Sequence, residues 1–260
     1  MSLTDAERKD LARAREILET PTFGMRILTL AGAPIEMGVE NLPAPVADKI
    51  MQVSRAALDR CLRTAVSTLR HSRRNKPSDT LHMSLAALSG GIGGAFGLPA
   101  LALELPISTV IMFRSIAEIA RSLGEDLEEP EALLNCLEVF ALGGRSKGDD
   151  AAETSYFAIR AGLAQAVREA SAHLASKGIG SRAASPALIR LTEAIAGRFG
   201  YAVSEKLVAA SVPVFGAFGG AAINAVFMDH FQNMAWAHFT VRALERKHGP
   251  DEVKEAWSGS

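Results

Sequence analysis

The chain has 260 residues, enough for one large domain or two small ones. Lysine and arginine number 28 against 29 for aspartate and glutamate, so no net positive field points to nucleic acid or to an anionic membrane. The two cysteines, Cys61 and Cys136, are far apart, which indicates neither a disulfide framework nor a cysteine-based metal site. The first twenty residues lack the apolar run of a signal peptide, so we expect a cytoplasmic location.

The apolar content comes mainly from alanine and leucine, because aromatic residues make up only 6% of the chain. Together with 22 glycines, this composition favours closely packed helices over a bulky β core. No stretch shows the sustained alternation of apolar and polar residues that is typical of strands. We therefore predict an all-α, multi-helix bundle that forms one domain over residues 1–260.

The N-terminal quarter of the chain predicts helices of contrasting character. Residues Thr4 to Glu7 match a capping box, which opens a charged amphipathic helix that ends near Glu19. Residues 22–42 are broken by glycine and proline and predict a kinked helix or two short ones. Apolar residues spaced by three and four predict a long amphipathic helix over 46–69. The basic cluster at 70–76 either places favourable cations at the end of that helix or contacts an anionic lipid headgroup.

Two long segments contain no ionisable residue: Met83–Leu103 and Leu207–Met228. The tetrapeptide Gly-Ala-Phe-Gly at 94–97 returns at 216–219, and each copy is followed by an apolar helix-like segment that then turns polar. These features predict two glycine- and alanine-rich helical hairpins, arranged as a pseudo-repeat over about 80–126 and 205–250. About 20 apolar residues can span a bilayer, but small residues four apart also let helices touch in soluble bundles. Both settings stay open.

Capping residues and glycine stops set the other helix boundaries. Helices are predicted over 131–142, from a capping box at 150 to about 177 and from 186 onward, with a linker at 178–185. The helix after each tetrapeptide is predicted to become more polar, over 106–123 and 229–248, and to end at the glycine stops Gly124 and Gly249.

The motifs that carry common chemistries do not occur in full. The glycine cluster at 91–96 has Phe96 where a dinucleotide-binding loop needs its last glycine, and no strand precedes it. No phosphate-binding loop and no nucleophile elbow is present. Glu245 and His248 have the ExxH spacing of di-iron bundles, which require a second such motif that the chain lacks. We predict no cofactor, no metal site and no catalytic residue.

Polar residues near the apolar units are the candidate contacts for a ligand or partner. They are Glu104, Arg114, Glu118, Asn224 and Asp229. Arg114 and Glu118 are four residues apart on one helix face and can pair. Glu104 either marks where the helix leaves the core or is a buried charge that needs a partner such as Arg114 or Arg121.

Two stretches, residues 97–126 and 212–231, resemble the EcsC family of bacterial proteins, and the general layout is similar over roughly residues 10–250. That family takes its name from the third member of an operon that encodes an ABC transporter. The resemblance implies an accessory role near a membrane export system. It implies no catalytic residues, because no settled reaction is associated with the family.

Two functional classes follow. The favoured one is a non-enzymatic, membrane-associated accessory protein whose partner is a membrane surface or a membrane transporter complex. The alternative is a soluble all-α enzyme, or a bundle that binds a small apolar ligand or lipid, with a polar pocket built from Glu104, Arg114, Asn224 and Asp229. Nucleic acid is not an expected partner, and the sequence predicts no oligomeric state.

Overall fold

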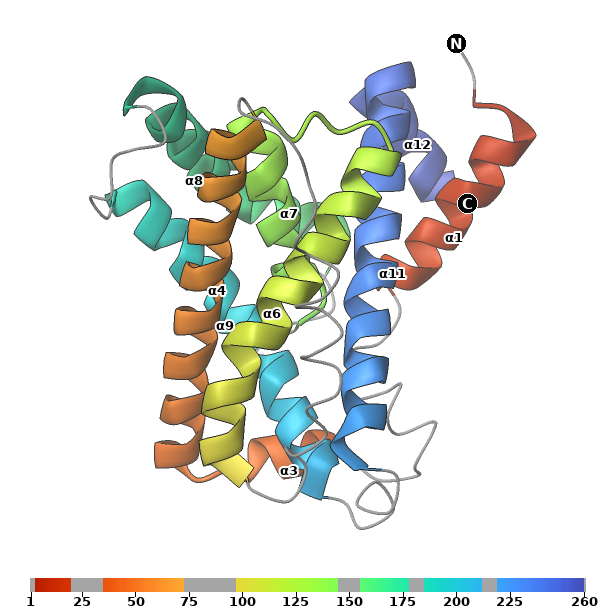
Figure 1. The fold of residues 1–260 in the computed structure, drawn as a ribbon. Coiled ribbons are helices and arrows are strands. Elements are labelled where there is room, and N and C mark those ends of the chain that lie inside the picture. The colour runs from red at the N-terminus through yellow and green to blue at the C-terminus, as the bar shows by residue number, and fades with distance from the viewer. Residues whose placement is uncertain are drawn as a thin grey trace.

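The computed structural model describes residues 3–19, 35–72, 97–144, 155–177, 185–211 and 219–259. Within these ranges the regular structure is α-helix, with no strand (Figure 1). The predicted all-α bundle is therefore confirmed. The two Gly-Ala-Phe-Gly tetrapeptides lie largely outside the described residues, so the two hairpins and their pseudo-repeat stay predictions.

The described helices follow one another along the chain, separated by short connections or by segments outside the described ranges. In order they are α1 (Asp5–Glu19), α3 (Ile35–Glu40), α4 (Ala44–Ser72), α6 (Gly97–Ser122), α7 (Pro130–Leu142), α8 (Tyr156–Lys177), α9 (Pro186–Ser211), α11 (Gly219–His248) and α12 (Pro250–Gly259).

Several helix ends confirm the predicted capping chemistry. At the start of α1, the Thr4 amide donates to Glu7 Oε2 at 2.8 Å and the Glu7 amide donates to Thr4 Oγ1 at 3.3 Å, which forms the predicted capping box. Gly124 and Gly249 have positive φ angles of 86° and 94°, the left-handed conformation that ends a helix at glycine. Ser185 Oγ accepts from the Ala187 amide at 3.2 Å and so caps α9.

The helices expected after the two tetrapeptides are present. Helix α6 begins at Gly97, so Pro106 lies inside it. The hydroxyls of Ser108 and Thr109 both donate to the Leu105 carbonyl, at 3.2 and 2.6 Å, next to the proline. Packing of α6 against α4 and α11 outweighs the unfavourable propensity of proline, because helix stability in proteins comes mainly from tertiary contacts. Helix α11 likewise begins at Gly219, as expected after the second tetrapeptide, and runs without a break into the polar part over 229–248.

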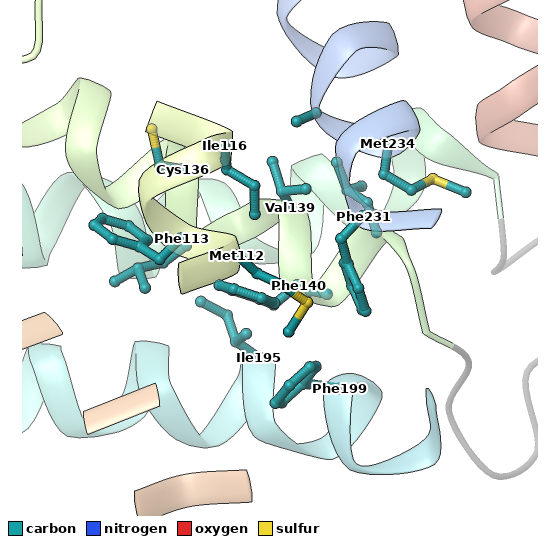
Figure 2. Packing of buried hydrophobic residues seen from close by; sticks show 14 of the residues in the cluster. Met112, Phe113, Ile116, Cys136, Val139, Phe140, Ile195, Phe199, Phe231 and Met234 are labelled. Carbon is teal, nitrogen blue, oxygen red and sulfur yellow. The ribbon is translucent and has the colours of Figure 1, made fainter. Parts of the chain in front are cut away.

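Helix α7 forms the centre of the bundle. All its residues from Ala132 to Leu142 are buried, and it packs against α4, α6, α8, α9 and α11. Phe140 meets Phe199 of α9 and Phe231 of α11 with ring centroids 5.0 and 5.3 Å apart (Figure 2). Such tilted and edge-to-face aromatic pairs add to the burial energy of the core.

The direction of each helix decides which segments share an end of the bundle. Gln232 of α11 donates to Ser115 of α6 at 2.8 Å, and Arg242 of α11 pairs with Glu125 beyond the end of α6. Helices α6 and α11 therefore run side by side in the same direction (Figure 1). Arg55 of α4 pairs with Glu193 of α9 at 2.8 Å, near the start of α9, so α4 ends far from the point where α9 ends.

Candidate functional site

Glu104 and Lys206 form an ion pair at the end of the bundle where α6 begins and α9 ends. Lys206 Nζ lies 2.8 Å from Glu104 Oε1 and 5.2 Å from the centre of the Phe227 ring. The Lys206 side chain is 7% exposed and that of Glu104 is 27% exposed. The predicted partners of Glu104, Arg114 and Arg121, were wrong, because α6 turns Glu104 toward α9 and not along its own axis.

Burial and the ion pair shift the pKa of Lys206 in opposite directions. Burial lowers the pKa of Lys206, because the charged ammonium loses its hydration, and the carboxylate of Glu104 opposes that shift. The ammonium also faces the Phe227 ring, whose negative π face attracts a cation. Lys206 is thus a nearly buried cation that depends on Glu104 for its charge.

The ion pair has a particular place in the sequence. Glu104 directly follows the first uncharged segment, and Lys206 directly precedes the second one. The two border charges are 102 residues apart in the chain, yet they bind each other. One border of each uncharged segment therefore lies at the same end of the bundle, which we call the apolar end: the end at which α6 and α11 begin and α9 ends (Figure 1).

The other predicted contact residues do not join this pair. Arg114 lies ten residues along α6 from Glu104, which is about 15 Å at the helical rise. Arg114 is half-buried and Glu118 is exposed, and no ion pair joins them in the described part of the chain. Asn224 is half-buried, and the exposed Asp229 accepts from Asn233 Nδ2 at 3.0 Å. Their roles as contact residues stay predictions.

A pocket of about 480 Å³ lies elsewhere, between α1 and α12. It is open to solvent and is lined in part by Leu11, Glu252 and Glu255. None of the five predicted contact residues borders it. This pocket is therefore not the polar pocket expected for a soluble enzyme or ligand-binding bundle.

A second group of polar residues was not predicted. Helices α7, α8 and α11 and the turn after α6 bring together seven side chains, which we call the polar cluster: Glu125, Glu138, Tyr156, Arg160, His238, Arg242 and Glu245.

Paired hydrogen bonds connect the cluster across the bundle. Arg160 donates to both oxygens of Glu245, at 2.8 and 2.9 Å. Arg242 donates to both oxygens of Glu125, at 2.9 and 3.2 Å, and Arg246 also binds Glu125. Such bidentate arginine–carboxylate contacts are strong and geometrically specific.

The pKa values of the cluster follow from its burial. Burial raises the pKa of Glu138 to about 7, although Arg160 and Arg242 oppose the shift. Burial lowers the pKa of His238 well below its ordinary value, and its Nδ1 lies 3.0 Å from the Tyr156 hydroxyl. Burial alone would raise the pKa of Glu125, but its arginine partners outweigh this and lower it.

The residues that sequence patterns single out for metal or thiol chemistry have other partners. Glu245 binds Arg160, and His248 Nε2 lies 3.1 Å from Glu7 Oε1, so the ExxH pair is engaged in protein contacts. Among the described residues no group of three or more histidine, cysteine or acidic side chains could hold a metal ion. Burial raises the pKa of Cys61 and of Cys136, which keeps both thiols in the unreactive protonated form.

One signal could have revealed the polar cluster. Glu138 interrupts the apolar run of the helix over 131–142, where every neighbour is expected in the core. A carboxyl in that position implies partners on the adjacent helices. The sequence does not say which helices those are, because Arg160 and Arg242 lie 22 and 104 residues further along.

Comparison with known proteins supports a single assignment. No curated protein and no solved structure matches the chain. The model of the EcsC protein family matches residues 27–244, which leaves α1 and α12 outside the match. That match covers most of the chain and agrees with the resemblance of residues 97–126 and 212–231. The chain belongs to the EcsC protein family.

Proposed function

We propose that this protein is a non-enzymatic accessory protein that binds a membrane surface through its apolar end, in the setting of an ABC-type transport system. The observation that carries the proposal is the Glu104–Lys206 pair. It joins Glu104, which follows the first uncharged segment, to Lys206, which precedes the second, so the described residues 97–103 and 207–211 of these two segments lie at the same end of the bundle.

Exposed apolar side chains at this end support a lipid contact. Leu103 is 76% exposed and Ile107 is 47% exposed, one helical turn apart on α6. Met37 of α3 is 58% exposed, and its neighbour Gly38 packs directly against Val208 of α9. Large apolar side chains that gather at one place on a surface mark contacts with proteins or membranes.

The proposed contact is interfacial. None of the described helices is long and apolar enough to cross a membrane, while residues 73–96 and 212–218 lie outside the described part. An apolar surface can enter the headgroup region of a bilayer without spanning it. Of the basic cluster at 70–76 the structure describes the backbone of residues 70–72, where α4 ends at the opposite end of the bundle (Figure 1).

The transport role rests on the family. Membership in the EcsC family, named for a gene beside an ABC transporter, supports a place next to a membrane export system. In cell fractionation we expect the protein in the membrane fraction. A carbonate wash then separates a peripheral protein, which is released, from an integral one. Recovery of all the protein in the cytosol, together with no binding to liposomes, would rule the membrane role out.

Replacing Leu103 and Ile107 together by serine should weaken binding to neutral phosphatidylcholine vesicles by about tenfold or more, because each loses the transfer energy of a large apolar side chain. Vesicle flotation with the full-length protein measures the effect. Added salt should change the binding little, because the proposed contact carries no unpaired charge.

Ile189 offers a matched control for this variant. It is 48% exposed, as Ile107 is, but it lies 17 residues before Lys206, about 25 Å along α9 from the apolar end. Ile189→Ser should leave vesicle binding unchanged. Equal losses in both variants would contradict a specific contact at the apolar end. Binding that requires anionic lipid would instead point to the basic cluster.

A further inference from the structure

Glu104 uses only one of its two carboxylate oxygens in the ion pair at the apolar end. Its Oε1 lies 2.8 Å from Lys206 Nζ. The other oxygen, Oε2, accepts no hydrogen bond from the described residues, and it is not sealed from the surface by them. The half-buried carboxylate therefore presents a second, unpaired acceptor at the surface of the bundle.

The environment of Lys206 leaves this second oxygen available. The lysine ammonium is stabilised by Glu104 Oε1 and also by the Phe227 ring, whose centre lies 5.2 Å from Nζ. A carboxylate has lone pairs on both oxygens and accepts several hydrogen bonds at once. Glu104 can therefore accept a further donor at Oε2 while its ion pair with Lys206 stays closed.

Apolar side chains border the carboxylate on the outer face of α6. Leu105 points into the core, whereas Leu103 and Ile107 are exposed. Successive residues of a helix are turned by about 100°, which places Glu104 on the flank between these two faces. Ser108, on the same flank, donates its hydroxyl to the Leu105 carbonyl at 3.2 Å and not to Glu104. The second oxygen of Glu104 thus lies beside large exposed apolar side chains.

This combination fits a lipid whose headgroup contains a hydrogen-bonding cation. A carboxylate oxygen forms its strongest hydrogen bonds with charged donors, and a primary ammonium offers three N–H groups. Phosphatidylethanolamine has such an ammonium at the end of its headgroup. Phosphatidylcholine has the same phosphate and acyl chains, but its trimethylammonium group has no N–H to donate. The two lipids therefore differ in the one group that Glu104 could bind directly.

We propose that Glu104 Oε2 binds the ammonium of a phosphatidylethanolamine headgroup, while Leu103 and Ile107 contact the apolar part of the same bilayer. The inference rests on the proposed membrane contact and adds the lipid class that this contact recognises. Lys206 is a positioning residue, because it holds the carboxylate through Oε1 and does not touch the lipid. The headgroup carries no net charge, since its phosphate balances its ammonium, so binding brings no net charge to the apolar end.

Bilayer packing is the rival explanation for any preference for phosphatidylethanolamine. Its small headgroup loosens the packing of the bilayer surface, which lets any apolar side chain enter more easily. Diacylglycerol loosens the surface in a similar way and has no ammonium. Vesicles that contain diacylglycerol therefore show how much of the preference comes from packing alone. Replacing Glu104 on unchanged vesicles separates the two explanations directly.

Flotation of the full-length protein is measured on phosphatidylcholine vesicles and on vesicles in which half of that lipid is replaced by phosphatidylethanolamine. Wild type should bind the second kind about fivefold more tightly, the effect of one charge-assisted hydrogen bond at a partly exposed site. Glu104→Gln should lose this preference. Lys206→Met should keep or raise it, because both carboxylate oxygens then face the headgroup. Glu131→Gln, an exposed acid on α7, should match wild type.

Equal binding of wild type to both kinds of vesicle overturns the lipid assignment and leaves the membrane contact standing, whereas no binding to either overturns both proposals. A preference that diacylglycerol reproduces, or that Glu104→Gln retains, assigns the effect to bilayer packing. Parallel losses in Glu104→Gln and Lys206→Met would mean that the ion pair acts only by holding the fold. Should Glu104→Gln not fold, as judged by far-UV circular dichroism, the double variant with Lys206→Met also lacks the carboxylate and serves for the same comparison.

Discussion

Glu104→Gln is expected to lower the free energy of unfolding by about 3 kcal/mol, and Lys206→Met by only about 1 kcal/mol. The asymmetry comes from burial. The Lys206 side chain is only 7% exposed. Without Glu104, its ammonium group therefore has no counter-ion and almost no contact with water. Without Lys206, the Glu104 carboxylate is 27% exposed and can take up water. A methionine at 206 also packs well against the Phe227 ring.

Urea denaturation of the two single variants and of the double variant measures these differences. The double variant should be more stable than Glu104→Gln alone, because it removes the stranded cation. Glu118→Gln, on an exposed position of the same helix, serves as the control and should change stability by less than about 0.5 kcal/mol. Equal and small losses in both single variants would mean that the pair behaves as an ordinary surface ion pair.

The same variants connect stability with the proposed membrane role. If the Glu104–Lys206 pair holds the borders of the uncharged segments together, its loss should change vesicle binding. The change should be visible at lipid concentrations at which Leu103 and Ile107 still contribute to binding. Lys206→Met keeps that end of the bundle apolar and nearly as stable. It therefore shows whether the lipid contact needs the ion pair itself or only the apolar surface around it.

Local sequence patterns predicted the structural features that depend on residues close together in the chain. The capping box of Thr4 and Glu7 and the glycine stops at Gly124 and Gly249 were confirmed, because each rests on a few adjacent residues. The continuous course of α6 through Pro106 depends instead on tertiary packing, because contacts with α4 and α11 offset the unfavourable propensity of proline inside a helix. No prediction covered α12, whose Trp257 is held by contacts with distant residues.

The candidate site shows the same difference between features set by adjacent residues and features set by distant ones. Spacing along one helix suggested Arg114 and Arg121 as partners for Glu104, whereas the true partner lies 102 residues away on α9. Helical periodicity reports which residues share a face, and it does not report which other helix covers that face. The polar cluster was missed for the same reason, although Glu138 within an apolar run was a visible sign of it.

Glu125→Gln should lower the free energy of unfolding by about 3 kcal/mol at neutral pH, because it leaves two arginines without their shared carboxylate. Glu125 is 5% exposed, and Arg242, its bidentate partner, is 20% exposed. The carboxylate also ties the turn after α6 to α11, since Arg246 donates to the Leu123 carbonyl as well. A neutral amide keeps the size of the side chain and loses the charge of the contact.

The pH dependence of this loss identifies its cause. The folded-state pKa of Glu125 lies below its ordinary value of 4.5, because Arg242 and Arg246 outweigh the effect of burial. Its stabilising contribution is therefore complete above pH 4.5 and disappears as the pH falls through the folded-state pKa. The difference in unfolding free energy between wild type and Glu125→Gln, measured by urea denaturation from pH 7 down to pH 3, should shrink in that acid range. Glu129→Gln, an exposed acid in the same turn, should follow the wild type throughout. A difference that stays constant with pH would assign the loss to packing and not to charge.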